Sequence, residues 1–181
     1  MGEVNLLFAL IYPLIFFSPA YVANSSPLFI SSIIRNLHPL DFGKIFIDGN
    51  RILGDGKTIE GTSFGLLLGL IYFYILKLVN DFLGITYLYY GYLDGIPIVV
   101  GALLGDIFGS FLKRRLNIKQ GEMLPIFDQL GFLVFALFIY SIFFDIPLSL
   151  DAIIYVLFVT FFTHILTNLG AYIFNIKDKP Y

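Results

Sequence analysis

Cysteine is absent from this chain of 181 residues. Its absence excludes disulfide bonds, zinc sites built on thiolates and catalysis by a thiol nucleophile, although it does not identify a redox compartment. The sequence also lacks an internal repeat, a low-complexity tail and the basic start and cleavage pattern of a signal peptide. We therefore expect a single domain spanning residues 1–181.

Charged residues are scarce. They make up 13% of the chain, whereas roughly 25% is usual in soluble domains. Hydrophobic residues reach 58%, and the mean hydropathy is +0.86. This composition predicts an integral membrane protein, in which the placement of charges is more informative than the formal net charge of -2.

Several apolar runs have the length of about 20 residues that a helix needs to cross a bilayer. Residues 4–34 carry no charge and are too long for one untilted helix, so we place a break at the Asn-Ser-Ser-Pro sequence of residues 24–27. Residues 28–34 would then lie at the interface or pack under the bundle. We expect an all-α membrane protein with five transmembrane helices at about residues 4–24, 62–79, 96–112, 125–144 and 150–174.

The cations predict the orientation of these spans. Ten of the eleven Lys and Arg residues fall in the loops at residues 35–61 and 113–124 or in the C-terminal tail. Five spans put these regions on one side, which the positive-inside rule makes cytoplasmic, with the N-terminus outside. The exception, Lys77, is expected to snorkel to the opposite interface. A belt of aromatic residues is expected at that face, at Tyr87, Tyr89, Tyr90 and Tyr92.

The loop at residues 35–61 contains the sequence Gly54-Asp55-Gly56-Lys57-Thr58. Flexible backbone amides, an ammonium group and a hydroxyl suit phosphate oxygens, and the positive end of the next helix follows directly. The sequence is not a Walker A loop, because Arg51 stands where the first glycine would fall and no strand precedes it. A plain glycine-rich turn with solvated charges explains it equally well.

A second cluster of polar residues extends from Gly105 to Gln129. If residues 96–114 are helical, four side chains share one face, at i, i+3, i+4 and i+7: Asp106, Gly109, Ser110 and Lys113. An ionisable residue such as Asp106 inside an apolar helix is costly and usually functional. Together with Asp128, it suggests a divalent metal ion that binds a polyphosphate.

Each part of this cluster also has a simpler interpretation. Gly101, Gly105 and Gly109, spaced by four, permit close helix packing. Arg115 and Lys119, taken singly, are typical of cations that meet anionic headgroups. Asp128 suits the first turn of a helix after a proline.

The motifs resemble those of the CDP-archaeol synthase family, archaeal relatives of bacterial CDP-diacylglycerol synthases. The resemblance covers most of the chain in order: Pro39-Leu40-Asp41-Phe42-Gly43, residues 48–58, Gly105-Asp106, Gly109-Ser110-Phe111, Lys113-Arg114-Arg115, Pro125, Asp128-Gln129 and Thr163-His164-Ile165-Leu166-Thr167-Asn168. One departure is Gly131, where family members often carry a further aspartate. It bears on how many carboxylates surround the metal.

The resemblance implies a membrane enzyme with its active site on the cytoplasmic side. It would join CTP to the phosphate of 2,3-bis-O-geranylgeranylglycerol 1-phosphate, giving CDP-archaeol and pyrophosphate with Mg²⁺. Membrane lipids are the expected surroundings; no nucleic acid is expected and no protein partner can be inferred.

On this basis each site residue has an expected role. Mg²⁺ would bind Asp106 and Asp128. Phosphate charge is assigned to Lys57, Lys113 and Arg114. Nucleotide or lipid-phosphate contacts and their supports are assigned to Arg51, Gly54, Asp55, Gly56, Thr58, Ser110, His164 and Asn168.

Several alternatives remain at this stage. His164, Thr167 and Asn168 form a polar stripe that suits either interhelical hydrogen bonding or substrate contact. A transporter of anions, a lipid-binding scaffold and a CDP-diacylglycerol synthase acting on phosphatidic acid are alternative functions. Acidic residues near the opposite face are expected to be solvated and to take no part in catalysis: Asp81, Asp94, Asp145 and Asp151.

Overall fold

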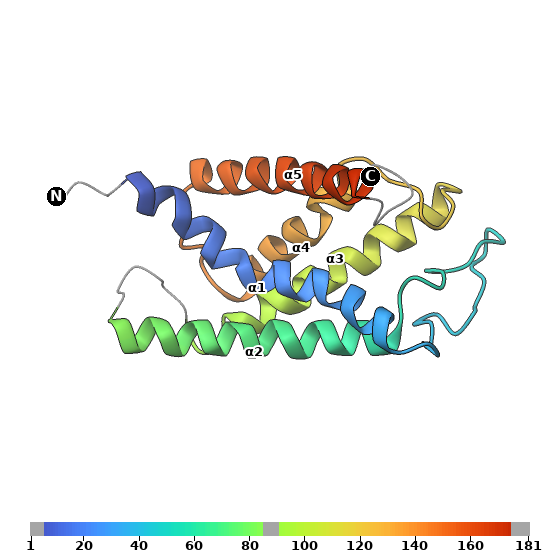
Figure 1. The fold of residues 1–181 in the computed structure, drawn as a ribbon, viewed down its shortest axis with the longest axis horizontal. Helices are drawn as coiled ribbons and strands as arrows, with labels where there is room; N and C mark the ends of the chain where they lie inside the picture. The colour runs from blue at the N-terminus through green and yellow to red at the C-terminus, as the bar shows by residue number, and fades with distance from the viewer. Residues whose placement is uncertain (1–5, 85–90, 175–181) are drawn as a thin grey trace.

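The computed structural model describes residues 6–84 and 91–174. Within them the chain forms five helices, as expected, and no strand (Figure 1). The helices are α1 (Leu6–Ile33), α2 (Ile59–Leu83), α3 (Gly95–Arg115), α4 (Phe127–Phe143) and α5 (Leu150–Ile173). Three described segments are long and apolar enough to cross a membrane: Ile59–Leu83, Gly95–Arg115 and Leu150–Gly170.

The first helix is longer than expected. It continues to Ile33 with Pro27 inside it, so the predicted end near residue 24 is wrong, and residues 28–33 extend the same helix. The reason is packing against glycines of α2, since a Cβ on Gly65 would lie 2.7 Å from the Ala23 carbonyl oxygen. Ser26 also donates a hydrogen bond from its hydroxyl to the Val22 carbonyl. These contacts outweigh the local tendency of proline to end a helix.

Close helix packing also joins α3 to α4. A Cβ on Gly101 would lie 2.6 Å from Ala136 Cα, and one on Gly105 would lie 2.5 Å from the Gly131 carbonyl oxygen. The packing interpretation is therefore confirmed for these two glycines. Around Gly109 there is open space, and this residue lines a pocket instead.

We expect Gly101→Val to lower the free energy of unfolding by about 1–3 kcal/mol or more, because backbone atoms of α4 have to move to admit the new side chain. The thermal unfolding midpoint in detergent measures this loss. Gly170→Ala is a matched control, because nothing lies within 4 Å of its added Cβ. An unchanged midpoint in the Gly101 variant would contradict the α3–α4 packing.

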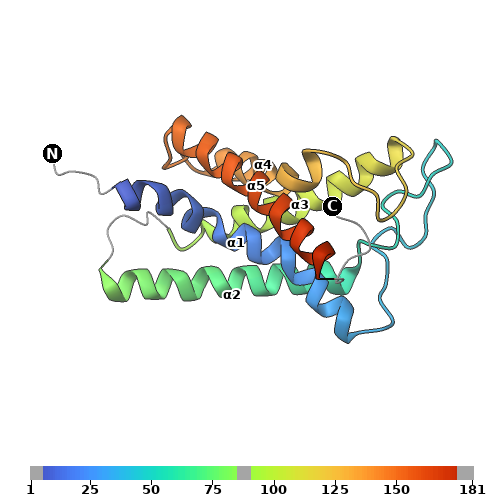
Figure 2. The same ribbon diagram turned by 45° about the horizontal axis from the view of Figure 1, so that its top comes forward.

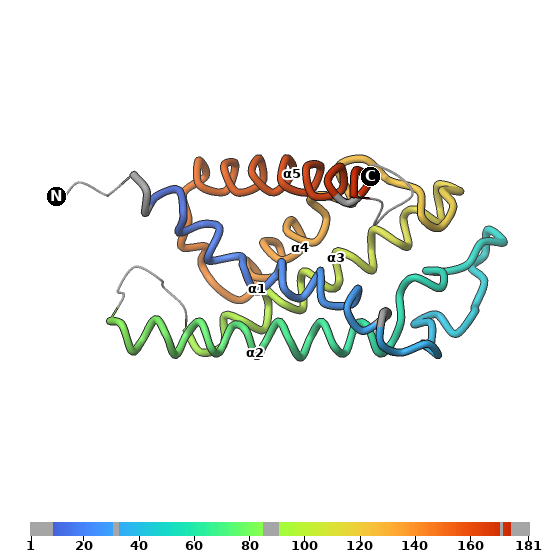
Figure 3. The backbone as a smooth tube through the Cα atoms, in the orientation of Figure 1, coloured from blue at the N-terminus to red at the C-terminus, as the bar shows by residue number. Residues whose placement is uncertain are grey.

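The hydrophobic core lies mainly between α1, α2, α3 and α4, around side chains such as Phe16, Phe73, Ile98 and Leu133. Helix α5 is packed more loosely, although Val156 is buried and the hydroxyls of Tyr21 and Thr160 share a hydrogen bond that ties α5 to α1. Helix α5 contacts α4 and α1, and Figure 3 shows it on the opposite side of the bundle from α2. Its remaining surface is largely exposed and apolar, as expected of a helix that faces lipid.

One acidic residue near the far end of the bundle departs from expectation. Asp94 is buried rather than solvated, because Tyr140 donates a hydrogen bond to it over 3.1 Å and the Gly91 amide donates another over 2.9 Å. Lys77, which was expected to snorkel to this interface, pairs with Asp81 and lies over the ring of Tyr92. The other tyrosines of the expected aromatic belt, at residues 87, 89 and 90, lie outside the described residues.

The arrangement of the helices brings two connecting segments together. The segment between α1 and α2, residues 34–58, and the segment between α3 and α4, residues 116–126, lie at the same end of the bundle (Figures 1 and 2). The segment between α4 and α5 lies at the opposite end (Figure 1). The two charged loops can therefore contribute to one site.

Candidate functional site

A pocket of about 520 Å³ opens where the 34–58 loop meets the helices. It is lined by the start of α2, the second half of α3 and the first turns of α4, and His164 of α5 also contributes. Nine residues proposed from the sequence line it: Asp55, Gly56, Lys57, Thr58, Asp106, Ser110, Lys113, Asp128 and His164. The structure therefore brings most of the predicted site together around one cavity.

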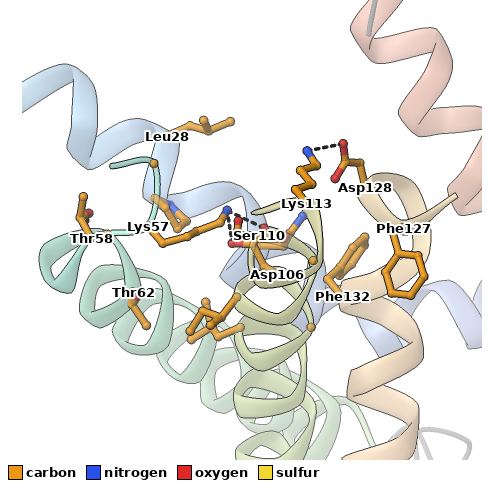
Figure 4. Close-up of a pocket in the computed structure, with 18 of the residues that line it drawn as sticks. Leu28, Lys57, Thr58, Thr62, Asp106, Ser110, Lys113, Phe127, Asp128 and Phe132 are labelled. Carbon is orange, nitrogen blue, oxygen red and sulfur yellow. Dashed lines mark hydrogen bonds and ion pairs between the residues drawn. The ribbon is translucent and has the colours of Figure 1, made fainter. Parts of the chain in front are cut away.

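Two carboxylate–ammonium pairs stand side by side in this pocket (Figure 4). Lys57 reaches from the loop to α3, with Nζ at 2.7 and 2.6 Å from the two carboxylate oxygens of Asp106. Lys113 reaches from α3 to α4, with Nζ 2.6 Å from Asp128 Oδ2. All four side chains are partly buried, which strengthens the electrostatic field at the pocket.

The helical spacing explains why α3 contributes so many of these groups. Asp106, Gly109, Ser110 and Lys113 all line the pocket, as expected for positions i, i+3, i+4 and i+7 of one helix. Lys113 sits in the last turn and also donates to the Glu122 carbonyl oxygen over 3.0 Å. Helix α3 thus presents a carboxylate, a hydroxyl and an ammonium group to the same space.

The first turn of α4 holds Asp128 in place. Its Oδ2 accepts a hydrogen bond of 2.9 Å from the Leu124 amide, which ties the preceding linker to the helix. The carboxylate therefore has a structural contact at the helix start as well as its contact with Lys113, and the two interpretations made from the sequence are compatible.

The start of α2 faces the pocket too. Thr58 caps the helix, because its hydroxyl oxygen accepts a hydrogen bond of 3.1 Å from the Gly61 amide. Thr62 in the same turn lines the pocket. The cap and the first-turn amides give this wall the positive character of a helix N-terminus.

The 34–58 loop is held in shape by Asp41, a residue to which the sequence analysis assigned no role. Its side chain is fully buried and accepts hydrogen bonds from Arg51 Nη2 over 2.7 Å, from the Leu53 amide over 2.9 Å and from the Gly54 amide over 3.0 Å. Burial disfavours the charged carboxylate, but these donors outweigh it and hold the pKa of Asp41 well below its usual range. The sequence signal for this residue was its place in the Pro39-Leu40-Asp41-Phe42-Gly43 motif, for which no role was expected.

We expect Asp41→Asn to lower the free energy of unfolding by about 2–4 kcal/mol, since it leaves a partly buried Arg51 and several amides less well paired. The folded-state pKa of Asp41 lies below the unfolded value of about 3.9, so the stabilisation is present above about pH 4 and is lost as the pH falls. Unfolding midpoints between pH 3 and pH 7 measure both effects. Asp145→Asn, at an exposed position, is the control, and equal stability of the two variants would contradict the role of Asp41.

Four proposed site residues lie outside the lining of this pocket. Arg51 pairs with Asp41 and, at 2.9 Å, with Asp55, so it supports the loop. Gly54 has a positive φ of 91°, and Arg114 packs its aliphatic part beside it. Asn168 lines a second pocket of about 250 Å³.

The polar stripe on α5 spans both pockets. Asn168 Nδ2 lies 3.3 Å from His164 Nδ1, and His164 lines the larger pocket. Thr167, the third member of the stripe, donates to the Thr163 carbonyl oxygen of its own helix. Hydrogen bonding within α5 is thus observed, and His164 also lies where it could contact a substrate in the larger pocket.

Sequence reasoning missed a set of residues that complete the pocket wall. They come from α1, from the start of α4 and from its second turn, and include Asn24, Pro27, Leu28, Phe127 and Phe132. The α1 members were missed because the helix was expected to end at residue 24. Phe127 and Phe132 were indistinguishable from other apolar positions of a membrane helix. These residues give the charged pocket an apolar side.

A metal ion in this pocket would need acidic or imidazole ligands. Within residues 6–84 and 91–174 there is no group of three or more His, Asp or Glu residues that could hold one. Mg²⁺, however, is commonly bound by one or two carboxylates together with substrate phosphates and waters. Asp106 and Asp128 fit that pattern. Gly131, the departure noted above, faces Gly105 across the α3–α4 contact and adds no carboxylate.

Comparison with known proteins agrees with the motifs. A family model described as CarS-like, CDP-archaeol synthase, matches residues 4–181. The CDP-archaeol synthase of Methanocaldococcus jannaschii is 41% identical over 96% of this chain and 97% of its own length. That of Pyrobaculum calidifontis is 39% identical over the whole of both chains, and that of Thermofilum pendens is 41% identical over 90% of this chain and 77% of its own.

A solved structure described as an intramembrane enzyme for archaeal membrane lipids biosynthesis has a similar fold. Its TM-score is 0.73 at 31% identity, covering 86% of this chain and 92% of that one. The family match, the curated relatives and this structure confirm the resemblance read from the motifs. The chain belongs to the CDP-archaeol synthase family.

Proposed function

We propose that this protein is an integral membrane cytidylyltransferase. It transfers CMP from CTP to the phosphate of 2,3-bis-O-geranylgeranylglycerol 1-phosphate and forms CDP-archaeol and pyrophosphate. The observation that carries the proposal is the pair of carboxylate–ammonium contacts, Lys57 with Asp106 and Lys113 with Asp128, around one pocket with an apolar side. The names of its relatives supply the substrate class.

The chemistry requires charge neutralisation more than a strong base. A phosphate monoester has a second pKa of about 6, so it is largely dianionic near neutral pH and can act directly as the nucleophile. One of its oxygens attacks the α-phosphorus of CTP, a new P–O bond forms, and the bond to the β-phosphate oxygen breaks as pyrophosphate leaves. No net proton transfer is needed. The obstacle is the approach of two anions.

The residues of the pocket would reduce the repulsion between the two anions. Lys57 and Lys113 would exchange their carboxylate partners for phosphate oxygens, placing two positive charges beside the reacting groups. The amides of residues 55–57 and the first turn of α2 would orient the triphosphate. Mg²⁺ bound by Asp106 and Asp128 would supply the additional positive charge that the triphosphate and the departing pyrophosphate require.

The apolar side of the pocket suits the lipid. Leu28, Phe127 and Phe132 lie on the same cavity as the charged groups, so the prenyl chains can stay among apolar side chains while their phosphate reaches Lys57 and Lys113. We further propose that this end of the bundle faces the cytoplasm, with the N-terminus outside, as the distribution of cations predicts. CTP would then reach the pocket from the cytoplasm.

The proposal is tested by pyrophosphate release from purified protein given Mg²⁺, CTP and the geranylgeranylated glycerol phosphate, with ATP, GTP and phosphatidic acid as competitors. We expect release that requires the ether lipid and CTP and is lost with EDTA. Equal use of phosphatidic acid would instead indicate a CDP-diacylglycerol synthase. A folded protein that binds CTP but releases no pyrophosphate with either lipid would contradict the proposal.

A further inference from the structure

Arg115, the last residue of α3, is packed against two aromatic rings that contact each other edge to face. Its guanidinium carbon lies 4.5 Å from the ring centre of Phe46, in the 34–58 loop, and 4.9 Å from that of Phe111, in α3. The side chain is 16% exposed. This position differs from the one expected from the sequence, where Arg115 was interpreted as a cation that meets lipid headgroups.

Polar contacts fix the same side chain to the loop. Arg115 Nη2 donates to the Arg51 carbonyl oxygen over 2.6 Å, and Nη1 lies 3.2 Å from Asp48 Oδ1. A neighbouring hydrogen bond of 2.9 Å joins Asn50 Nδ2 to Asn117 Oδ1. Residues 46–51 are therefore attached to the end of α3 by stacking, by an ion pair and by hydrogen bonds.

This attachment continues to the pocket. The Arg51 backbone binds Arg115, while the Arg51 side chain binds Asp55 over 2.9 Å. Asp55 and Lys57 line the pocket, and Lys57 forms an ion pair with Asp106 of α3. The loop is thus fixed to one helix at two points, Asp106 and Arg115, which are nine residues or about 13 Å apart along the axis.

We propose that Arg115 is a positioning residue, which holds the 34–58 loop on α3 so that Lys57 meets Asp106 in the geometry used for the nucleotide. It does not itself line the pocket, so its effect reaches the substrate through Arg51, Asp55 and Lys57. The effect of Arg115 on turnover rests on the proposed function. The attachment of the loop to α3 is independent of that function.

The chemistry of the contact requires arginine. A guanidinium group is planar, so it can lie against the rings of Phe46 and Phe111 while one nitrogen donates to a carbonyl group and another forms an ion pair with Asp48. A lysine ammonium keeps the charge but cannot lie flat against an aromatic ring and reach both the Arg51 carbonyl and the Asp48 carboxylate at once. Arg115→Lys therefore distinguishes a positioning role of the guanidinium group from an effect of its positive charge alone.

The first test compares Arg115→Ala and Arg115→Lys with Lys119→Ala, which removes an exposed cation near the same end of the bundle. We expect both Arg115 variants to lose about tenfold to thirtyfold in kcat/KM for CTP, with the KM for the lipid within about twofold of normal. Lys119→Ala should be near normal. Full activity in Arg115→Lys, or an equal loss in Lys119→Ala that depends on anionic lipid content, would overturn the proposal.

The second test needs no turnover. A lysine-specific protease should release the fragment of residues 1–44 from both Arg115 variants at least about tenfold faster than from wild type, because the loop opens more often. Phe46→Leu should have a similar effect, and combining it with Arg115→Ala should add little, as expected of residues that share one contact. Unchanged cleavage would overturn the positioning role even if the cytidylyltransferase proposal holds, and faster cleavage would support it even if that proposal fails.

Discussion

Asp106→Asn is expected to reduce the rate of pyrophosphate release by about 1,000-fold or more. The amide keeps the size of the side chain but removes the negative charge that pairs with Lys57 and that would hold Mg²⁺. A metal-binding carboxylate acts on the transition state as well as on nucleotide binding, so kcat and kcat/KM should both fall. The measurement is steady-state pyrophosphate release at saturating lipid.

The loss should occur without unfolding. Asp106 is partly exposed to the pocket, and the close contacts of α3 with α4 at Gly101 and Gly105 do not involve its side chain. The thermal midpoint of the variant should therefore stay within a few degrees of wild type. Asp151→Asn, an exposed acidic position in the first turn of α5, is the matched control. Turnover of Asp106→Asn within tenfold of this control would show that the carboxylate is not needed.

Lys57→Ala is expected to reduce turnover by about 100-fold to 1,000-fold. The change removes one of the two ammonium groups in the pocket and leaves the Asp106 carboxylate without that partner. Positive charge placed where negative charge develops is among the largest contributions to phosphoryl-transfer catalysis. Lys57→Arg should recover only part of the activity, because a larger planar group cannot occupy the same position.

A double substitution separates catalysis from structure. If the contact between Lys57 and Asp106 only stabilised the fold, replacing Lys57 by Met and Asp106 by Asn together would restore both stability and turnover. We expect the thermal midpoint of the double variant to lie near that of wild type and the activity to remain absent. Recovery of activity in the double variant would contradict a catalytic role for the pair.

The sequence was sufficient to predict the parts of the site that lie within one element. The stripe from Asp106 to Lys113 followed from the 3.6-residue period of a helix, and five helices followed from hydrophobic length. The loop with Lys57 was placed near them because an even number of spans separates the two loops. These predictions depended only on the helical period and on the number of membrane spans between the loops.

Features that depend on distant partners could not be predicted in this way. Pro27 stays inside α1 because small residues of α2 allow close packing, and Asp94 is buried because Tyr140, far along the chain, reaches it. Arg115 resembled any cation at a helix end until the loop residue Phe46 was found against it. In each case the deciding contact joins residues far apart in the sequence.

We propose above all that the two carboxylate–ammonium pairs jointly hold one nucleotide and its metal ion. A crystal structure of the protein with CTP and Mn²⁺ in place of Mg²⁺ tests it most directly, since the anomalous signal of manganese locates the ion. We predict the ion at Asp106 and Asp128, with Lys57 and Lys113 turned to the phosphate oxygens. A triphosphate bound elsewhere, or an ion bound without either carboxylate, would contradict the account.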